Sequence, residues 1–303
     1  MDQHISNAKL TLKKNGKSFY WAGKFLPSAY IDRASELYQF CRVLDDIADS
    51  GERGSLQTLK KIKSNFINYK ELKFKNNYNL KYPSFFNIYS KKAATHLIDG
   101  LILDQSTVLF KEEEELIQYS YYVAGTVGLM MCDALKCKNK EAYLFAIDLG
   151  IAMQLTNIAR DVLEDAKMGR RYIPGSWINN ISPNAMIQGV NDNNTEIFRT
   201  VSFGIKKLLN LAEKYYYSGN QGLIFLPLKT RIAISIASGV YRQIGIQLKL
   251  KNYCWYNGRQ VTSNITKAKV TFYRIIEEFI RNKNQKNHDP ELHKFLKEII
   301  VSE

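Results

Sequence analysis

Two stretches of the chain place carboxylate side chains at intervals of three and four residues. In the first stretch, Tyr38, Arg42, Asp45 and Asp49 follow one another at steps of four, three and four, and Ser35 extends the series by one turn. Such steps bring side chains to one face of a helix. Carboxylates stacked in this way repel one another and are costly to bury unpaired. The first stripe, as we call this series, therefore needs a cation.

A second stripe repeats the arrangement in the middle of the chain. Gln154, Asn157, Asp161 and Asp165 are separated by three, four and four residues, and the positions between them are mostly apolar. We expect one helix over about 143–165 to carry them. A ligand set made only of oxygens suits Mg²⁺ better than zinc. Two such stripes facing each other would hold Mg²⁺ together with the phosphate oxygens of a substrate.

Each stripe also carries a nearby arginine, Arg42 in the first and Arg160 in the second. Arginine does not bind metal ions, but it binds phosphate oxygens well. A single Asp-Asp-x-x-Asp sequence is more typical of a solvated helix face. Two stripes with apolar flanks and arginines instead favour a site that ionises an organic diphosphate, where metal and arginines neutralise the leaving group and the cavity excludes water.

The elements that must position these stripes are helices. Apolar residues recur at steps of three and four over 34–47 and 142–155, and period-two alternation is scarce. The pattern predicts an all-α fold in one domain over 1–303, with its core at about 17–270. We expect 281–303 to form a peripheral C-terminal segment and the Asn-rich stretch 182–194 to be poorly ordered.

Composition limits the function classes. The chain has 303 residues and a net charge of +14, with 45% hydrophobic residues, which excludes extensive disorder. No window approaches 18 consecutive apolar residues and the N-terminus lacks an apolar signal region, so we expect neither a spanning helix nor a secretory signal. Four scattered cysteines indicate reduced thiols in the cytoplasm. The positive charge has no zinc-finger or RNP1-like motif beside it, so no nucleic-acid partner is expected.

The stripes lie within longer strings that resemble the squalene/phytoene synthase family of head-to-head prenyl synthases. The resemblance extends from about residue 17 to 269 and is strongest to the bacterial phytoene synthase branch. It implies an isoprenoid-synthase-type helical bundle around a central cavity. The strings are KSFY at 17–20, LYQFCRVLDDIAD at 37–49, YSYYVAGTVG at 119–128, QLTNIARDVLED at 154–165 and GRRYIP at 169–174.

The resemblance implies a Mg²⁺-dependent condensation of two geranylgeranyl diphosphates, through prephytoene diphosphate, to phytoene, the first committed step of carotenoid biosynthesis. Mn²⁺ is an alternative metal, and no NADPH is expected. Two alternatives stay open at this point. One is a squalene or dehydrosqualene synthase that uses farnesyl diphosphate. The other is a non-catalytic assembly protein at a membrane surface, although such relatives tend to lose the aspartates.

The resemblance also assigns roles to individual residues. It implies a catalytic set of four aspartates with Arg160 and Tyr121, and it leaves the final proton acceptor open between Tyr121 and a bound diphosphate. His96, His288 and His293 receive no role. The implied metal ligands are Asp45, Asp49, Asn157, Asp161 and Asp165. The implied substrate-binding residues are Lys17, Ser18, Tyr38, Arg42, Gln154, Asn157, Arg171 and Tyr241.

An apolar product and a positive chain suggest where such an enzyme works. We expect a cytoplasmic protein that associates peripherally with an anionic membrane surface, where it also meets downstream carotenoid enzymes. The small residues Gly23 and Ser35 are expected to line the deep end of the cavity and to leave room for the fourth isoprene unit of a C20 chain. Close helix packing is the alternative explanation for both.

Overall fold

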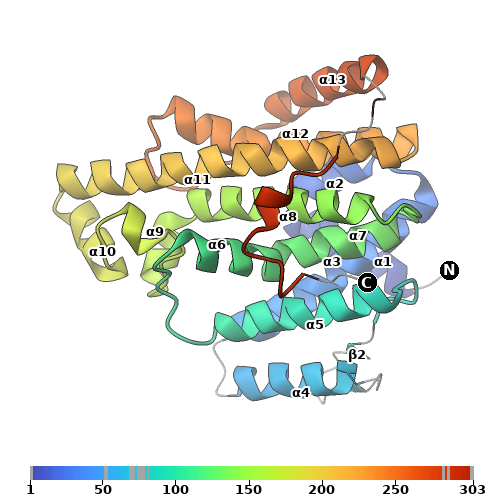
Figure 1. Cartoon of the computed structure of the whole chain (residues 1–303), viewed down its shortest axis with the longest axis horizontal. Coiled ribbons are helices and arrows are strands. Elements are labelled where there is room, and N and C mark those ends of the chain that lie inside the picture. The colour runs from blue at the N-terminus through green and yellow to red at the C-terminus, as the bar shows by residue number, and fades with distance from the viewer. Residues whose placement is uncertain are drawn as a thin grey trace.

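The protein is described here by a computed structural model that covers residues 3–50, 54–67, 72–73, 79–80, 82–281, 284 and 287–300. The all-α prediction is confirmed, with one small antiparallel hairpin in addition (Figure 1). In chain order the elements are α1 (Gln3–Asn15), α2 (Lys17–Gly23), α3 (Ser28–Asp49), α4 (Ser55–Ile67), β1 (Leu72–Lys73), β2 (Asn79–Leu80), α5 (Ile88–Leu103), α6 (Glu113–Ser120), the π-helix η1 (Tyr121–Gly125), α7 (Thr126–Ala134), α8 (Ala142–Arg160), α9 (Val162–Lys167), α10 (Pro183–Asn191), α11 (Thr195–Gln221), α12 (Leu228–Leu250) and α13 (Asn264–Ile280), with 3-10 turns η2 (Gly175–Trp177), η3 (Gly222–Phe225) and η4 (Pro290–His293).

Helix α8 lies at the centre of the bundle, with α11, α7 and α12 packed against it (Figure 1). By length and composition α8 could cross a membrane, but 67% of its apolar 18-residue stretch is buried inside the fold. That burial is the pattern of a core helix whose apolar surface is covered by other helices. The second stripe therefore starts from the most enclosed element of the protein.

Glycines let α7 and η1 approach α8 closely. A Cβ atom at Gly128 would lie 2.0 Å from the carbonyl oxygen of Ala146, and one at Gly150 would lie 2.2 Å from that of Ala124. Real Cβ atoms do not come so near to backbone, so any side chain at either position would push the helices apart. Tyr121 is the first residue of η1, and Ala124 and Gly125 of the same element lie against Gly150 of α8. This close packing sets the position of Tyr121.

The stretch 182–194 forms a helix, so the prediction of poor order there is wrong. Ser182 accepts a hydrogen bond from the backbone N–H of Ala185, and Pro183 occupies the first turn of α10. A serine cap followed by proline is a common helix start. The following Asn194 caps α11 in the same way, by accepting from the N–H groups of Glu196 and Ile197.

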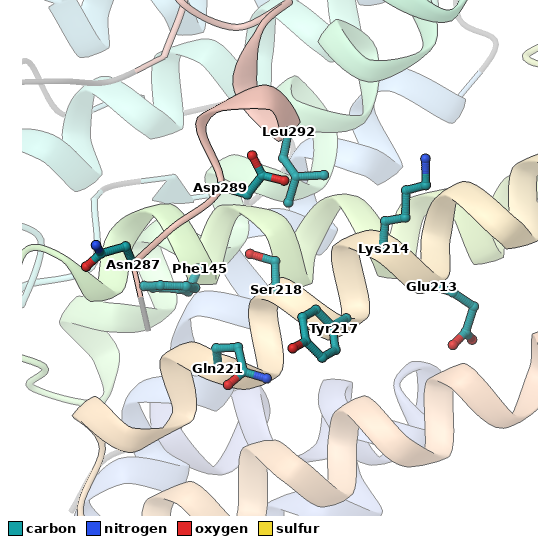
Figure 2. Close-up of a pocket in the computed structure, with 9 residues that line it drawn as sticks. All are labelled: Phe145, Glu213, Lys214, Tyr217, Ser218, Gln221, Asn287, Asp289 and Leu292. Atoms are coloured by element: carbon teal, nitrogen blue, oxygen red, sulfur yellow. The ribbon is translucent and has the colours of Figure 1, made fainter. Parts of the chain in front are cut away.

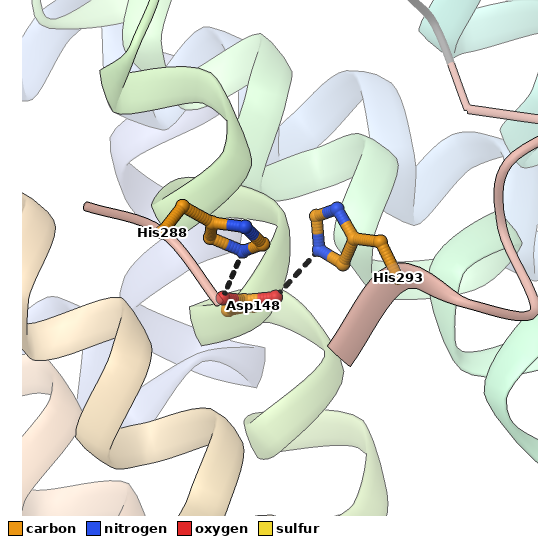
Figure 3. Close-up of side chains that lie close together, drawn as sticks. All are labelled: Asp148, His288 and His293. Atoms are coloured by element: carbon orange, nitrogen blue, oxygen red, sulfur yellow. Dashed lines mark hydrogen bonds and ion pairs between the residues drawn. The ribbon is translucent and has the colours of Figure 1, made fainter. Parts of the chain in front are cut away.

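The C-terminal segment packs into the core, which corrects the prediction that it is peripheral. Leu296 is fully buried, and His293 is nearly so. His288 and His293 each place Nε2 on one carboxylate oxygen of Asp148 in α8, at 2.8 and 2.7 Å (Figure 3). Asp148 is fully buried, and hydrogen bonds from both imidazoles lower its pKa against the effect of burial. The ionised carboxylate thus accepts bonds from both rings and from Ser218.

We expect Asp148→Ala to destabilise the protein by about 3 kcal/mol, because it leaves buried donors without their acceptor. Urea unfolding followed by circular dichroism measures the change. Glu291→Ala, an exposed carboxylate in the same C-terminal segment, serves as the control and should change stability by less than about 0.5 kcal/mol. Equal effects of the two substitutions would contradict this account of how the segment is held.

Candidate active site

The structure places the two stripes on three helices. The first stripe follows one face of α3, as predicted. The second begins on α8, but the helix is interrupted at Asp161, whose φ and ψ are −105° and 15°. Asp165 therefore lies on the separate short helix α9. The predicted single helix over 143–165 is corrected by this break, which changes the direction in which the last two aspartates point.

A carboxylate that the sequence did not reveal lies between the stripes. Asp104 follows the last residue of α5, and its charge acts on Asp45 of the first stripe and on Asp165 of the second. Burial raises the pKa of Asp104 above its ordinary value, and Asp49 adds to this effect. Hydrogen bonds from Tyr119 and Tyr172 and the charge of Arg170 oppose the shift without cancelling it. The two stripes therefore meet in one electrostatic cluster.

Hydrogen bonds hold Asp104 in place within this cluster. The hydroxyls of Tyr119 and Tyr172 each donate to one of its carboxylate oxygens at 2.8 Å. The two tyrosine rings stack with centroids 4.8 Å apart, so the donors form a rigid pair. Arg170 donates to the backbone carbonyl of Asp104 at 3.1 Å. A partly buried acid with fixed donors on both oxygens is well positioned to orient neighbouring ligands.

Two carboxylates of the cluster, Asp45 and Asp165, lack sufficient positive charge around them. Burial raises the pKa of Asp45 to about 7, although Arg42 opposes the shift. Burial likewise raises the pKa of Asp165 to about 8, with Asp161 adding to the effect and Arg170 opposing it. Removal from water and like-charge repulsion both favour the protonated form. A bound cation would reverse both effects.

A test of whether the residues fit a metal comes from Asn157. Its side-chain nitrogen donates to Gln154 Oε1 at 3.2 Å, but its Oδ1 atom is buried and has no hydrogen-bond partner among the described residues. A buried acceptor without a donor costs free energy. An amide oxygen beside carboxylates is the kind of ligand that a hard divalent cation takes. The residues of the two stripes fit a divalent metal ion.

Asp161 is held by two arginines. Arg160 donates to its Oδ1 atom from Nε at 2.7 Å, and Arg259 donates to both oxygens at 2.7 and 2.9 Å. Arg259 lies in the loop after α12 and was not predicted. Its side chain is 53% exposed, so it can turn from Asp161 to an incoming anion. Paired guanidinium groups of this kind match the geometry of phosphate oxygens.

Arg171 binds backbone carbonyl groups. Its side chain is buried and donates to the carbonyl oxygens of Ile181 at 3.0 Å and Phe110 at 2.9 Å. The reason is backbone pairing, because residue 171 exchanges hydrogen bonds with Val108 and Phe110. The arginine that belongs to the carboxylate cluster is its neighbour Arg170, whose pKa is raised by Asp104 and other nearby groups against the effect of burial.

Aromatic side chains line the space next to the first stripe. Phe19 of α2 stacks on Tyr241 of α12, with ring centroids 5.1 Å apart, and lies 6.4 Å from Tyr38 of α3. Burial raises the pKa of Tyr38 to about 12, so the ring keeps its proton. Lys17 and Ser18 precede Phe19 at the start of α2. Phe19 thus connects Tyr38 of α3 and Tyr241 of α12, two of the predicted residues.

Tyr121 lies deeper in the protein than the other predicted residues. It is fully buried, and its hydroxyl lies 3.1 Å from Nδ1 of His96 on α5. Burial lowers the pKa of His96, so the imidazole is neutral. No role was predicted for His96, because its contact with Tyr121 depends on the packing of α5 on η1. Tyr121 sits in a π-helix, a local irregularity frequent at functional sites.

Arg42 is turned toward Asp46, a carboxylate outside the first stripe. It forms an ion pair with Asp46 one turn further along α3, on the exposed side of the helix. Its Nε atom is buried without a hydrogen-bond partner in the part of the chain that the structure describes. The arginine therefore retains a donor that a substrate oxygen can accept from.

A pocket lies elsewhere in the fold. It has a volume of about 440 Å³ and is bordered by Phe145 of α8, by Ser218 and Tyr217 of α11 and by Leu292 of the C-terminal segment (Figure 2). Asp161 follows Phe145 by 16 positions, which corresponds to about 24 Å along a helix. This pocket is thus next to the Asp148 network and remote from the carboxylate cluster.

The carboxylate cluster leads to a pH-dependent prediction. The pKa of Asp165 is about 8 in the folded chain and 3.8 for an ordinary aspartate, so the folded state holds a proton that the unfolded state has lost. Stability of the metal-free protein must then fall as the pH rises through this interval. We expect Asp165→Asn to raise the melting temperature by about 2 °C or more near pH 9 and by less near pH 5. Calorimetry of the metal-free protein at the two pH values, with Asp46→Asn as control, measures this, and an equal gain at both pH values would contradict it.

Comparisons with known proteins agree with this geometry. A family model described as squalene/phytoene synthase matches residues 12–273. The chain is 30% identical over 278 residues to the phytoene synthase of Pseudescherichia vulneris, with 86% of this chain and 87% of that one covered. It is also 30% identical over 272 residues to the 15-cis-phytoene synthase of Pantoea ananas, with the same coverage.

Solved structures show the same fold. A dehydrosqualene synthase in complex with a ligand superposes with a TM-score of 0.75 at 23% identity, covering 90% of this chain and 95% of that one. A squalene synthase from Alicyclobacillus acidocaldarius superposes with a TM-score of 0.64 at 16% identity, covering 82% and 94%. The helical bundle around α8 is common to all three.

Proposed function

Because the chain belongs to the squalene/phytoene synthase family, we propose that it joins two geranylgeranyl diphosphates head to head to form phytoene. The enzyme is a prenyltransferase. The observation that carries the proposal is the cluster in which Asp104 links the aspartates of α3 to those of α8 and α9. Relatives that are 30% identical over most of the chain support the C20 substrate over farnesyl diphosphate.

The metal ligands follow from the fit described above. Asp45, Asp49, Asn157, Asp161 and Asp165 would hold the divalent ion, for which we propose Mg²⁺. When bound, Mg²⁺ supplies the positive charge that lets the diphosphate leave. The chain itself contributes the carboxylates at fixed positions and excludes water from them with the apolar flanks of α3 and α8.

Guanidinium groups receive the diphosphates. Arg160 and Arg259, which now share Asp161, can donate to phosphate oxygens instead. Arg170 holds the Asp104 end of the cluster, and Arg42 offers its unpaired Nε atom. These arginines lower the free energy of a leaving group whose charge increases in the transition state.

Aromatic rings face the carbocation. Loss of the first diphosphate leaves an allylic cation, which the double bond of the second prenyl chain attacks. Loss of a proton from the resulting cation closes the ring and gives a cyclopropyl diphosphate. A second loss of diphosphate, ring rearrangement and loss of one proton then give phytoene. The stacked Phe19 and Tyr241 rings with Tyr38 provide electron-rich faces beside the site. The released diphosphate and Tyr121 are both candidate proton acceptors.

Gly23 and Ser35 stay candidates for small residues that leave room for a longer chain, with close helix packing as the alternative. A Cβ atom at Gly23 would lie 2.5 Å from Cδ1 of Ile31, the end of a flexible side chain. Ser35 is fully buried, and its hydroxyl has no hydrogen-bond partner among the described residues. The C20 preference in this proposal is supported by the relatives.

Product analysis tests the proposal. The pure protein is incubated with Mg²⁺ and either C15 or C20 diphosphate, with and without NADPH, and the hydrocarbon is identified by mass spectrometry. Phytoene formed from the C20 substrate without NADPH is the expected result. A hydrocarbon formed only from the C15 substrate would show a squalene or dehydrosqualene synthase, and no hydrocarbon from either would show a non-catalytic relative.

We also propose that the enzyme works in the cytoplasm, attached peripherally to an anionic membrane. The net charge of +14 supports an electrostatic attraction to such a surface. A substrate with a long apolar chain and a product without polar groups both partition into lipid. Attachment would shorten the path of both molecules between the bilayer and the site.

A further inference from the structure

Helix α13 exposes apolar side chains and buries polar ones, the reverse of an ordinary surface helix. The exposed residues recur at steps of three and four along one side, which we call the α13 face. Soluble proteins rarely leave a contiguous apolar surface of this size uncovered. Its apolar residues, each at least 45% exposed, are Ile265, Phe272, Tyr273, Ile276, Phe279 and Ile280.

Polar contacts on the opposite side fix this orientation. Glu278 is buried and pairs with Arg281 at 2.6 Å and with Arg231 of α12 at 3.2 Å. Thr271 accepts a hydrogen bond from the indole of Trp21 in α2 at 3.0 Å. Rotating α13 to hide its apolar residues would break these contacts and bury the charges unpaired. The outward direction of the α13 face is therefore set by the fold.

The charge around the α13 face is positive. Lys269 is the one charged side chain among the exposed residues of α13, as the structure describes that helix. The adjacent α2 adds Lys17, whose charge acts on Lys267, and Lys24, whose Nζ lies 5.2 Å from the Trp21 ring centre. An apolar surface rimmed by lysines matches an anionic lipid headgroup layer above an apolar interior.

A second copy of the chain fits this surface less well. Two identical faces meeting around a two-fold axis would bring Lys269 and the α2 lysines of each copy toward those of the other. Like charges brought together in this way oppose association. The same lysines favour a negatively charged lipid surface.

The α13 face also lies directly outside the wall of the proposed active site. Helices α2, α12 and α13 share an apolar cluster that includes Ala22, Val240 and Val270, with Phe19 at its inner side. Phe19 in turn stacks on Tyr241. We propose that the α13 face is the surface by which this protein lies on an anionic bilayer, with α13 parallel to the membrane plane. This inference rests on the peripheral attachment proposed above and assigns it to one helix.

Vesicle binding tests the assignment without any substrate, so it is independent of whether phytoene is the product. Phe272→Ser combined with Phe279→Ser should lower the partition coefficient on phosphatidylcholine–phosphatidylglycerol vesicles by about tenfold or more. The matched control combines Phe203→Ser with Leu10→Ser, which are equally exposed apolar residues outside α13. It should bind within about a factor of two of the unchanged protein. Lys269→Glu should weaken binding only to the anionic vesicles.

Activity and mass measurements complete the test. Both double variants should form product in detergent micelles at the rate of the unchanged protein, which shows that they are folded. Unchanged vesicle binding of the α13 variant would overturn the proposal. The proposal would also be overturned if the α13 variant had a lower solution mass by light scattering and bound vesicles as before. That result would make the α13 face a contact between copies.

Discussion

Replacing Asp45 by asparagine is expected to lower turnover by on the order of 10³-fold while the helical fold survives. Asp45 belongs to the carboxylate cluster, and its charge is required only when metal and diphosphate are present. Asp161→Asn should have a similar effect, because it removes a proposed ligand and also frees Arg160 and Arg259. Steady-state rates at saturating Mg²⁺, with circular dichroism as a measure of folding, test both.

The neighbouring Asp46 provides a matched control for this prediction. It lies on the same helix, is exposed and pairs with Arg42 at the surface. Exposed ion pairs contribute little, so Asp46→Asn should keep turnover within about fivefold. If Asp46→Asn and Asp45→Asn lost activity equally, a general disturbance of α3 would explain the loss better than a missing metal ligand.

Substitution of Asp104 by asparagine should raise the Mg²⁺ concentration for half-maximal rate by about tenfold. Asp104 links the two stripes electrostatically, and hydrogen bonds from two tyrosines hold it in place. An uncharged amide in this position no longer attracts the cation. Initial rates over a Mg²⁺ titration measure the effect, and Asp104→Glu should recover part of the affinity.

Asp99, on the same helix α5, is the control for Asp104. Its carboxylate pairs with Lys63 of α4, on another side of the helix. Asp99→Asn should leave the Mg²⁺ dependence unchanged even if it lowers stability slightly. A change in maximal rate for Asp104→Asn with no shift in Mg²⁺ dependence would argue that Asp104 only supports the fold.

Much of the site could be predicted because its spacing is local. Steps of three and four along one helix place Asp45 and Asp49 together regardless of what surrounds them, and the same holds for Gln154 and Asn157. The all-α fold followed from the same periodicity. Ser182 and Pro183 are a local signal for the start of α10. The prediction of poor order there came from the asparagine content of 182–194 and did not use this signal.

The remaining site residues come from tertiary structure. Asp104 and Arg259 are single polar residues with no partner nearby in sequence, and helix packing and a loop bring them to the cluster. Which of Arg170 and Arg171 faces the carboxylate cluster depends on the backbone hydrogen bonds of residue 171 with Val108 and Phe110. This pairing sets the direction of each side chain. Asp148 and His293 meet across 145 residues, a contact that no local pattern indicates.

Metal binding in the presence of inorganic pyrophosphate tests most directly whether the two stripes form one site. Electron paramagnetic resonance of free Mn²⁺ gives the affinity without turnover. We predict that Asp45→Asn of α3 and Asp165→Asn of α9 each weaken Mn²⁺ binding by about tenfold or more. His293→Ala, which alters the remote Asp148 network, should leave it unchanged. Full Mn²⁺ affinity in either aspartate variant, or loss of binding in His293→Ala, would contradict a metal site shared by the two stripes.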